Sequence, residues 1–295
     1  MRDARGVRLP VYYTPRMVAD SASFSPSAAK PAQVVAAWQA RALPIELIEP
    51  VPVTIDQLAR AHDRTHVEKI LACRAPNGFG NTSPEVAATL VHTSGAMLSA
   101  ARRALADHAV ACAPVAGFHH AMYRTAGAFC TFNGLMVTAL ALHHEDRVGR
   151  VGILDYDMHY GNGTADIIAR TDATFVVHYS AGAHYDEPSH AARLLAELPG
   201  HVREMAGCDV VLYQAGADQH VADPFGGVLT TDELRRRDEI VFAGLAALGI
   251  PVAWNLAGGY QKEPDGSIPR VLEIHENTAR AALAAAPTQR RGDPA

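Results

Sequence analysis

Three side chains that can bind a metal occupy alternate positions in the segment LDYDMHYGNGT. If the chain is extended there, Asp155, Asp157 and His159 project to the same side, because successive side chains of a strand point to opposite faces. Two carboxylates and an imidazole suit a borderline metal such as zinc. Gly161 and Gly163 allow a sharp turn into a following helix. The segment predicts ligands at Asp157 and His159, but taken alone such a cluster more often caps a helix or stabilises a loop.

A third ligand is expected at Asp218, since catalytic zinc usually has three protein ligands and one open position. Asp218 follows the apolar run DVVLYQAGA, in which Gly216 and Ala217 would let the backbone approach a metal closely. The competing interpretation is equally strong at this point: Asp218 would cap a helix or stabilise the turn that leads to Asp223 and Pro224.

Two imidazoles and a phenol supply the other groups that a metal-assisted hydrolysis needs. His119 and His120 follow the apolar run AVACAPVAGF and are candidates for the base. Asp155 would orient one ring and Asn162 the other, and because an amide partner adds less basicity than a carboxylate, their pKa values would differ. Tyr260 follows LAGG and is the candidate oxyanion donor. The alternatives are ordinary surface histidines and a tyrosine bonded to the backbone.

These residues follow separate apolar runs that the fold must bring together. Short β-branched runs alternate with longer Ala-rich segments of helical period, which is the pattern of a parallel sheet covered by helices. We predict an α/β fold, a single-domain parallel sheet flanked by helices on both faces, with the candidate residues at the carboxyl ends of its strands. The predicted strands are 11–14, 45–49, 109–113, 151–155, 174–178, 209–214 and 252–256, and the predicted helices are 32–41, 55–61, 66–74, 84–107, 133–144, 165–170, 232–248 and 269–285.

The composition is that of an ordinary globular protein, with 48% hydrophobic and 19% charged residues among 295 and a net charge of −5. The 26 Lys and Arg residues form no run, which argues against a nucleic-acid partner. No leader pattern and no membrane span are found, so a cytoplasmic location is expected. We predict one catalytic domain over 1–286, a frayed tail at 287–295, loops at 79–83, 180–189, 219–229 and 261–267, and four reduced, mostly buried cysteines.

Five motifs in order resemble the histone deacetylase superfamily. They are AGFHHA at 116–121, GAFCTFNG at 127–134, ILDYDMHYGNGT at 153–164, QAGADQHVADPFGG at 214–227 and LAGGYQK at 256–262. The resemblance covers most of the chain and is closest, through GFHH, Asn162 and GGYQK, to the class IV branch. It implies the arginase-like α/β fold of these zinc-dependent enzymes. It also implies the activity of a bacterial-type deacetylase, which is the hydrolysis of an acylated amine.

Carried over residue by residue, the resemblance implies one zinc ion on Asp157, His159 and Asp218, with His119 and His120 as the catalytic imidazoles. His120 is favoured as the group that moves the proton, and His119 as an electrostatic group. Iron is also compatible with such a donor set.

The resemblance also assigns the surroundings of the metal. Tyr260 would polarise the acyl carbonyl. Asp155 would lie next to the groups around the metal and hold them in place without binding the metal itself. Phe129 would form one wall of an acyl tunnel, with Tyr185 as the facing wall.

Several positions depart from the family pattern. The usual His-Pro pair near the N-terminus is replaced within SFSPSAAKP, and Ala128 stands where glycine is common. Val176 stands where we place the family's hydroxyl residue, two before His178, which puts a structural potassium ion in doubt. AGAHYDEPSH replaces an aromatic-Pro loop, so the mouth of the tunnel is expected to be reshaped.

The predicted substrate is an acylated lysine in a protein or peptide, and an acetylpolyamine or another small amide is the alternative. A two-manganese ureohydrolase is disfavoured because Tyr160 and Gly161 follow His159 where a further Asp is needed. A non-catalytic scaffold that binds acyl-lysine is disfavoured because Tyr260 is retained. Acyl chain length and oligomeric state stay open.

Overall fold

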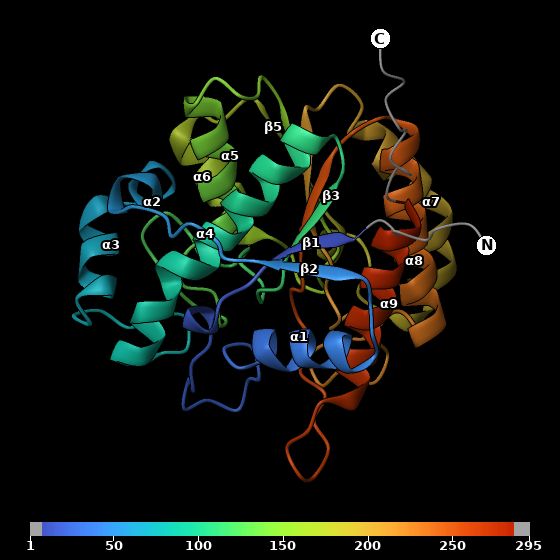
Figure 1. Ribbon diagram of the computed structural model, residues 1–295, viewed down its shortest axis with the longest axis horizontal. Helices are drawn as coiled ribbons and strands as arrows, with labels where there is room; N and C mark the ends of the chain where they lie inside the picture. The colour runs from blue at the N-terminus through green and yellow to red at the C-terminus, as the bar shows by residue number, and fades with distance from the viewer. Residues whose placement is uncertain (1–7, 286–295) are drawn as a thin grey trace.

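The computed structural model describes residues 8–285 and contains a seven-stranded sheet in which all strand pairs are parallel (Figure 1). The strand order is β2-β1-β3-β7-β6-β4-β5. The strands are β1 (Leu9–Tyr12), β2 (Ile45–Ile48), β3 (Val110–Ala113), β4 (Val151–Asp155), β5 (Val176–Ser180), β6 (Val210–Gln214) and β7 (Val252–Asn255). The predicted α/β class is confirmed, whereas the predicted tail at 287–295 lies outside the described residues.

Helices cover both faces of the sheet. The α-helices are α1 (Lys30–Ala40), α2 (Ile55–Ala61), α3 (Arg64–Leu71), α4 (Pro84–Asp107), α5 (Gly134–His144), α6 (Asn162–Thr171), α7 (Ala191–Glu204), α8 (Thr231–Ala247) and α9 (Pro269–Ala285). Short 3-10 helices are η1 (Pro15–Met17), η2 (Ala181–Ala183) and η3 (Pro188–His190). In Figure 1, α2 to α6 lie on one side of the sheet and α7 to α9 on the other.

Two hydrophobic cores follow from the alternation of side chains along the strands. Leu154 of β4 packs in the core beneath α1, α7, α8 and α9, whereas its neighbour Ile153 packs in the core beneath α2 to α6. Tyr213 and Leu212 of β6 divide in the same way. Every central strand is buried on both faces, which explains its nearly continuous apolar sequence.

Helix α7 was not predicted, because Pro199 and Gly200 stand in its interior. A proline there loses a backbone hydrogen bond and costs roughly 3 kcal/mol. Burial of Leu194, Leu198 and Val202, spaced four residues apart on one face, offsets that cost. Strand β5 also lies two residues later than predicted.

The central strands end level with one another, and this positions the site. Ala113, Asn255, Gln214 and Asp155 are successive partners across β3, β7, β6 and β4. The segments that leave these four neighbouring strands carry all the candidate metal-binding and catalytic side chains. The sheet edge therefore collects residues that are more than a hundred positions apart in the sequence.

Two expectations about the chain as a whole can be checked in the described part. None of the helices between residues 8 and 285 has the length and apolar character needed to cross a membrane. The four cysteines are free, three of them buried and Cys73 partly exposed.

A buried arginine ties helix α8 to the strand ends. Arg237 is fully buried and donates to the carbonyls of Tyr156 (3.1 Å) and Gly216 (2.7 Å) and to Gln219 Oε1 (3.0 Å). Its partner carboxylate is Asp238, at 2.9 Å. The two loops that leave β4 and β6 are thereby fixed against the same helix.

We expect Arg237→Met to lower the free energy of unfolding by about 3–5 kcal/mol, because the buried Asp238 carboxylate loses its counter-charge. Arg235→Met is the matched control, since Arg235 forms an exposed pair with Glu239 four residues later and should cost less than about 0.5 kcal/mol. Urea unfolding of both variants measures the difference, and equal losses would contradict this role of Arg237.

Candidate metal centre and catalytic cleft

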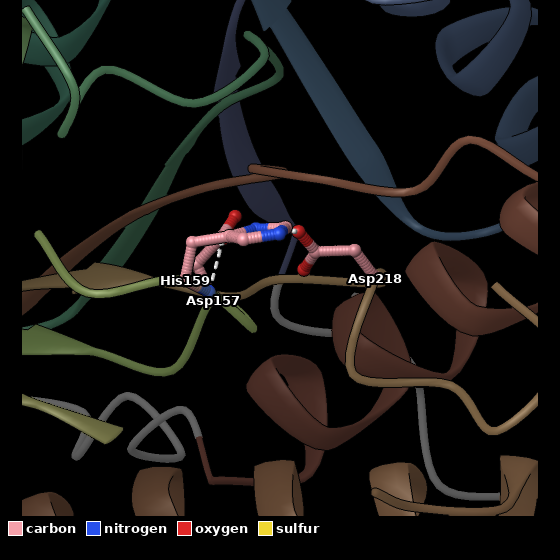
Figure 2. A group of neighbouring side chains, drawn as sticks. All are labelled: Asp157, His159 and Asp218. Atoms are coloured by element: carbon pink, nitrogen blue, oxygen red, sulfur yellow. Dashed lines mark hydrogen bonds and ion pairs between the residues drawn. The ribbon is translucent and has the colours of Figure 1, made fainter. Parts of the chain in front are cut away.

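Asp157, His159 and Asp218 converge at the carboxyl ends of β4 and β6, as Figure 2 shows. One ligand atom from each lies within 4.8 Å of the others. His159 Nδ1 lies 3.3 Å from Asp157 Oδ1 and 3.3 Å from Asp218 Oδ2. Three side chains predicted as ligands from two separate motifs thus share one small volume.

The two carboxylates are buried together, and this favours a bound cation. Asp157 is 3% exposed and Asp218 is fully buried. Burial and the neighbouring Asp157 raise the pKa of Asp218, whereas the pKa of Asp157 is lowered, against burial, by His119 and His159. Among the residues that the structure describes, none forms a hydrogen bond with the buried Asp218 Oδ2. An orphaned oxygen beside a second carboxylate and an imidazole fits a divalent metal with mixed oxygen and nitrogen ligands.

Glycines permit the close approach of these ligands. A Cβ on Gly258 would lie 2.1 Å from Asp218 Cγ, and one on Gly216 would lie 2.5 Å from Asp157 Cα. One on Gly182 would lie 2.3 Å from the carbonyl carbon of His159. The Gly258 amide also donates to Asp157 Oδ2 at 3.0 Å. These positions therefore need glycine for steric reasons.

His119 is buried beside two acids. Its Nδ1 donates to Asp155 Oδ2 at 2.7 Å, and its Nε2 lies 3.4 Å from Asp157 Oδ1. Burial alone lowers the pKa of His119, but Asp155 and Asp157 outweigh it and raise this pKa to about 9. Gln214 fixes the arrangement by donating from Nε2 to Asp155 Oδ1 at 3.1 Å. The ring is therefore held protonated near neutral pH.

His120 has the opposite electrostatic environment. Its Nδ1 lies 2.7 Å from Asn162 Oδ1, the predicted partner, and none of the described residues forms a hydrogen bond with its Nε2. Burial and the adjacent His119 lower the pKa of His120 below its usual value. The ring centroids of His119 and His120 are 4.1 Å apart. One imidazole is thus held as a cation and the other as a neutral base.

Tyr260 lies on the wall of the same cleft. Its backbone amide donates to Asp223 Oδ2 at 2.7 Å. Burial, together with the nearby carboxylates of Asp218 and Asp157, raises the pKa of Tyr260 well above its usual value, so the phenol keeps its proton. Behind the loop, the buried Lys30 ammonium donates to the carbonyls of Ala257 and Gly258 and so fixes the chain that carries Tyr260.

A cleft of about 370 Å³ opens above the metal ligands. It is lined by Phe24, His120, Ala128, Phe129, His159, Phe225 and Tyr260. Phe129 has a φ of 64° and Ala128 one of 46°, a left-handed backbone that costs roughly 1–2 kcal/mol for such residues. The Phe129 amide donates to Gly78 O at 2.9 Å, which helps to hold the ring in the wall.

Tyr185 does not form the facing wall, and that prediction is wrong. Its side chain is 1% exposed, packs in the core and donates from its hydroxyl to Glu197. The loop from 181 to 190 folds inward as η2 and η3, because Gly182 packs directly on His159. Phe225, from the loop after β6, lines the cleft together with Phe129 and takes the place proposed for Tyr185.

The strand register also corrects the argument from Val176. Val176 pairs with Val151 at the amino end of β4, whereas the residue paired with Asp155 is Ser180. Ser180 is buried, and its Oγ accepts from the Gly161 amide at 2.9 Å. A hydroxyl therefore lies beside Asp155 although residue 176 is valine, and the doubt about a potassium ion stays a prediction.

Sequence reasoning missed several residues of the site. Lys30 and Phe24 carry no local motif, because they reach the site only through long-range packing. Gln214 begins the quoted motif QAGADQHVADPFGG, but its bond to Asp155 joins two different strands and could not be read from the sequence. Asp223 and Phe225 lie in the quoted motif QAGADQHVADPFGG. The signal that could have revealed them is an acidic and an aromatic residue on either side of a proline, in a loop that follows a strand.

Comparison with known proteins gives a consistent family. The histone deacetylase domain profile matches residues 26–191. A protein of Methanothermobacter thermautotrophicus described as a probable deacetylase is 27% identical over 260 residues, covering 74% of this chain and 75% of its own. The HDA15 HD domain superimposes with a TM-score of 0.76 at 18% identity, covering 96% and 92% of the two chains. An acetylpolyamine aminohydrolase from Burkholderia pseudomallei superimposes with a TM-score of 0.71 at 19% identity, covering 94% and 99%.

We expect Gly258→Ala to weaken zinc binding at least about tenfold, because the new methyl group displaces the Asp218 carboxylate. Gly200→Ala is the matched control: it lies in α7, where the added methyl would meet the flexible end of Arg203 at an ordinary contact distance of 3.8 Å. The control should keep the zinc affinity and gain up to about 1 kcal/mol of stability. Titration calorimetry measures both affinities, and undiminished binding by Gly258→Ala would show that the ligands lie elsewhere.

Proposed function

The chain belongs to the histone deacetylase family, and from this premise we propose that it is a zinc-dependent hydrolase of N-acyl amides. The observation that carries the proposal is the convergence of the three candidate ligands with His119, His120 and Tyr260 around one cleft. Bound there, zinc would lower the pKa of a water toward about 7 and polarise the acyl carbonyl.

The chain's own residues supply the proton transfers. His120 is neutral near pH 7 and presents a free Nε2, so it takes the proton of the attacking water and delivers it to the departing amine. His119 stays protonated and stabilises the negative charge that develops as water adds. The different partners of the two rings, Asn162 and Asp155, set this division of labour.

Tyr260 holds the acyl oxygen. Its phenol keeps its proton and lines the cleft beside His120 and His159, so it donates a hydrogen bond where the oxyanion develops. The backbone bond to Asp223 and the Lys30 bonds behind the loop fix its approach. Phe129 and Phe225 exclude water from the substrate chain between them.

An acylated lysine side chain is the substrate we propose. An acetylpolyamine is the second candidate, because one structural neighbour carries that activity in its name. In both substrates the acylated nitrogen is attached to an aliphatic chain that would fill the cleft. The two substrates differ in the charge at the other end of that chain.

We expect Tyr260→Phe to retain one zinc ion per chain but to lower kcat about 10²–10³-fold, because the oxyanion loses a donor. Asp218→Ala should lose the zinc itself. Tyr13→Phe, which removes a phenol hydroxyl outside the cleft, is the control for the loss of a hydroxyl. Metal analysis and the hydrolysis of a fluorogenic acetyl-lysine measure both properties, and full activity in Tyr260→Phe would refute the proposed role.

Asn162, the partner of His120, should determine the pH at which kcat/KM falls on the acid side of its pH profile. In the parent, burial and the adjacent His119 lower the pKa of His120 below its usual value, so the neutral base is present above this lowered pKa and is lost as the pH falls through it. Asn162→Asp places a carboxylate on Nδ1 and raises this pKa, so the acid limb of kcat/KM should move to higher pH. Asn162→Ala should move it to lower pH. A limb that shifts in neither variant would show that His120 is not the base.

A further inference from the structure

Four aromatic side chains that line the cleft pack on one another in a closed cycle of contacts. We call Phe24, Phe129, Phe225 and Tyr260 the aromatic mouth. Neighbouring ring centroids are 5.3 Å apart for Phe24 and Phe129, 5.5 Å for Phe129 and Tyr260, 5.0 Å for Tyr260 and Phe225, and 5.6 Å for Phe225 and Phe24. The four come from separate segments of the chain, so this cycle exists only in the folded protein.

No carboxylate lines this cleft within the described residues. Asp223 lies behind the wall, is 5% exposed, and uses its oxygens to accept from the amides of Tyr260 (2.7 Å) and Phe225 (3.1 Å). The charged group at the rim is a cation instead, because the Lys262 ammonium donates to the carbonyl of Phe24. A second ammonium entering with a substrate would meet the like charge of Lys262, and none of the described residues that line the cleft offers it a carboxylate.

We propose that the aromatic mouth selects acylated amines whose far end is neutral or anionic and rejects those that carry a second ammonium, such as acylated polyamines. This inference rests on the proposed function and names its substrate class. An ammonium loses its water on entering an apolar ring, and without a carboxylate or another acceptor that loss is not recovered. A blocked lysine in a peptide carries no such charge on the side of the chain that fills the cleft.

The four rings pack on one another, and this covers part of their faces. Phe24 meets Phe129 at an interplanar angle of 84°, and Phe225 meets Tyr260 at 88°. In each of these edge-to-face pairs the positive edge of one ring covers the negative face of the other. Cation–π binding needs open faces turned toward the ligand. A face covered in this way is not open to an ammonium, so one ring face in each of the two pairs cannot bind it.

Phe24 is the residue that we assign to specificity. It is 59% exposed, lies ahead of the segment matched by the family profile, and contacts the rings on both sides of the entrance. Lys262, in the segment that follows Tyr260, anchors its backbone. An exposed phenylalanine that bridges the entrance meets the part of the substrate that lies beyond the acyl group.

Three amides with one acyl group and one spacer test the inference. They are N-acetylputrescine, N-pentylacetamide and 5-acetamidopentanoate, whose far ends are cationic, neutral and anionic. With the zinc-loaded protein we expect kcat/KM for the neutral and anionic amides to exceed that for N-acetylputrescine about tenfold or more. Equal or faster hydrolysis of N-acetylputrescine would overturn the inference.

Variants that introduce a carboxylate test whether Phe24 causes the preference among the three amides. Phe24→Glu should narrow or reverse the preference, because it places a carboxylate at the aromatic mouth. Leu248→Glu is the matched control, since Leu248 is exposed just before β7, at the amino end of the sheet, and its variant should keep the parent ratio. An unchanged ratio in Phe24→Glu would refute the role of Phe24.

Binding of the same three amides, measured by calorimetry, separates this inference from the proposed function. If none of them is hydrolysed, nor any acyl-lysine, the proposed function fails, while the order of the binding constants still decides the preference of the aromatic mouth. Tighter binding of N-acetylputrescine would contradict it in that case.

Discussion

The structure depends on two buried carboxylates that face one another. Asp157 and Asp218 lie in the segments that follow the neighbouring strands β4 and β6, and both are almost completely buried. Among the described residues, one oxygen of Asp218 has no hydrogen-bond partner. Burying such a pair costs several kcal/mol unless a cation joins it. The glycines that let the carboxylates approach, and Arg237, which holds the loops of both strands, make sense as parts of a metal site. The rest of the cleft is arranged around that charge.

The surrounding residues divide the chemistry by environment. His119 and His120 are adjacent in sequence, yet the carboxylate of Asp155 and the amide of Asn162 give them opposite protonation states. Farther out, the side chains become aromatic and uncharged. Charge is therefore concentrated at the floor, where a carbonyl reacts, and is absent from the walls, where an aliphatic chain must pass. This gradient links the proposed reaction to the proposed choice of substrate.

The sequence was sufficient to predict the strands and the edge at which the chemistry lies, because apolar runs and the polar residues that follow them are local signals. It was insufficient for the strand order, which depends on long-range packing. Helix α7 was not predicted because Pro199 lies inside it, and the burial that offsets a proline in a helix cannot be read from the local sequence. Tyr185 was misplaced because a loop's direction is set by what it packs on, here Gly182 against His159. Phe24 and Lys30 reach the site from the N-terminal region, and no spacing reveals that.

The central claim is that Asp157, His159 and Asp218 hold the catalytic metal. Anomalous diffraction at the zinc absorption edge, from crystals of the zinc-loaded protein, tests it most directly. The account predicts one strong peak about 2.0–2.2 Å from a ligand atom of each of the three residues. A peak bound by other residues, or no peak in protein that still hydrolyses an acyl amide, would contradict it.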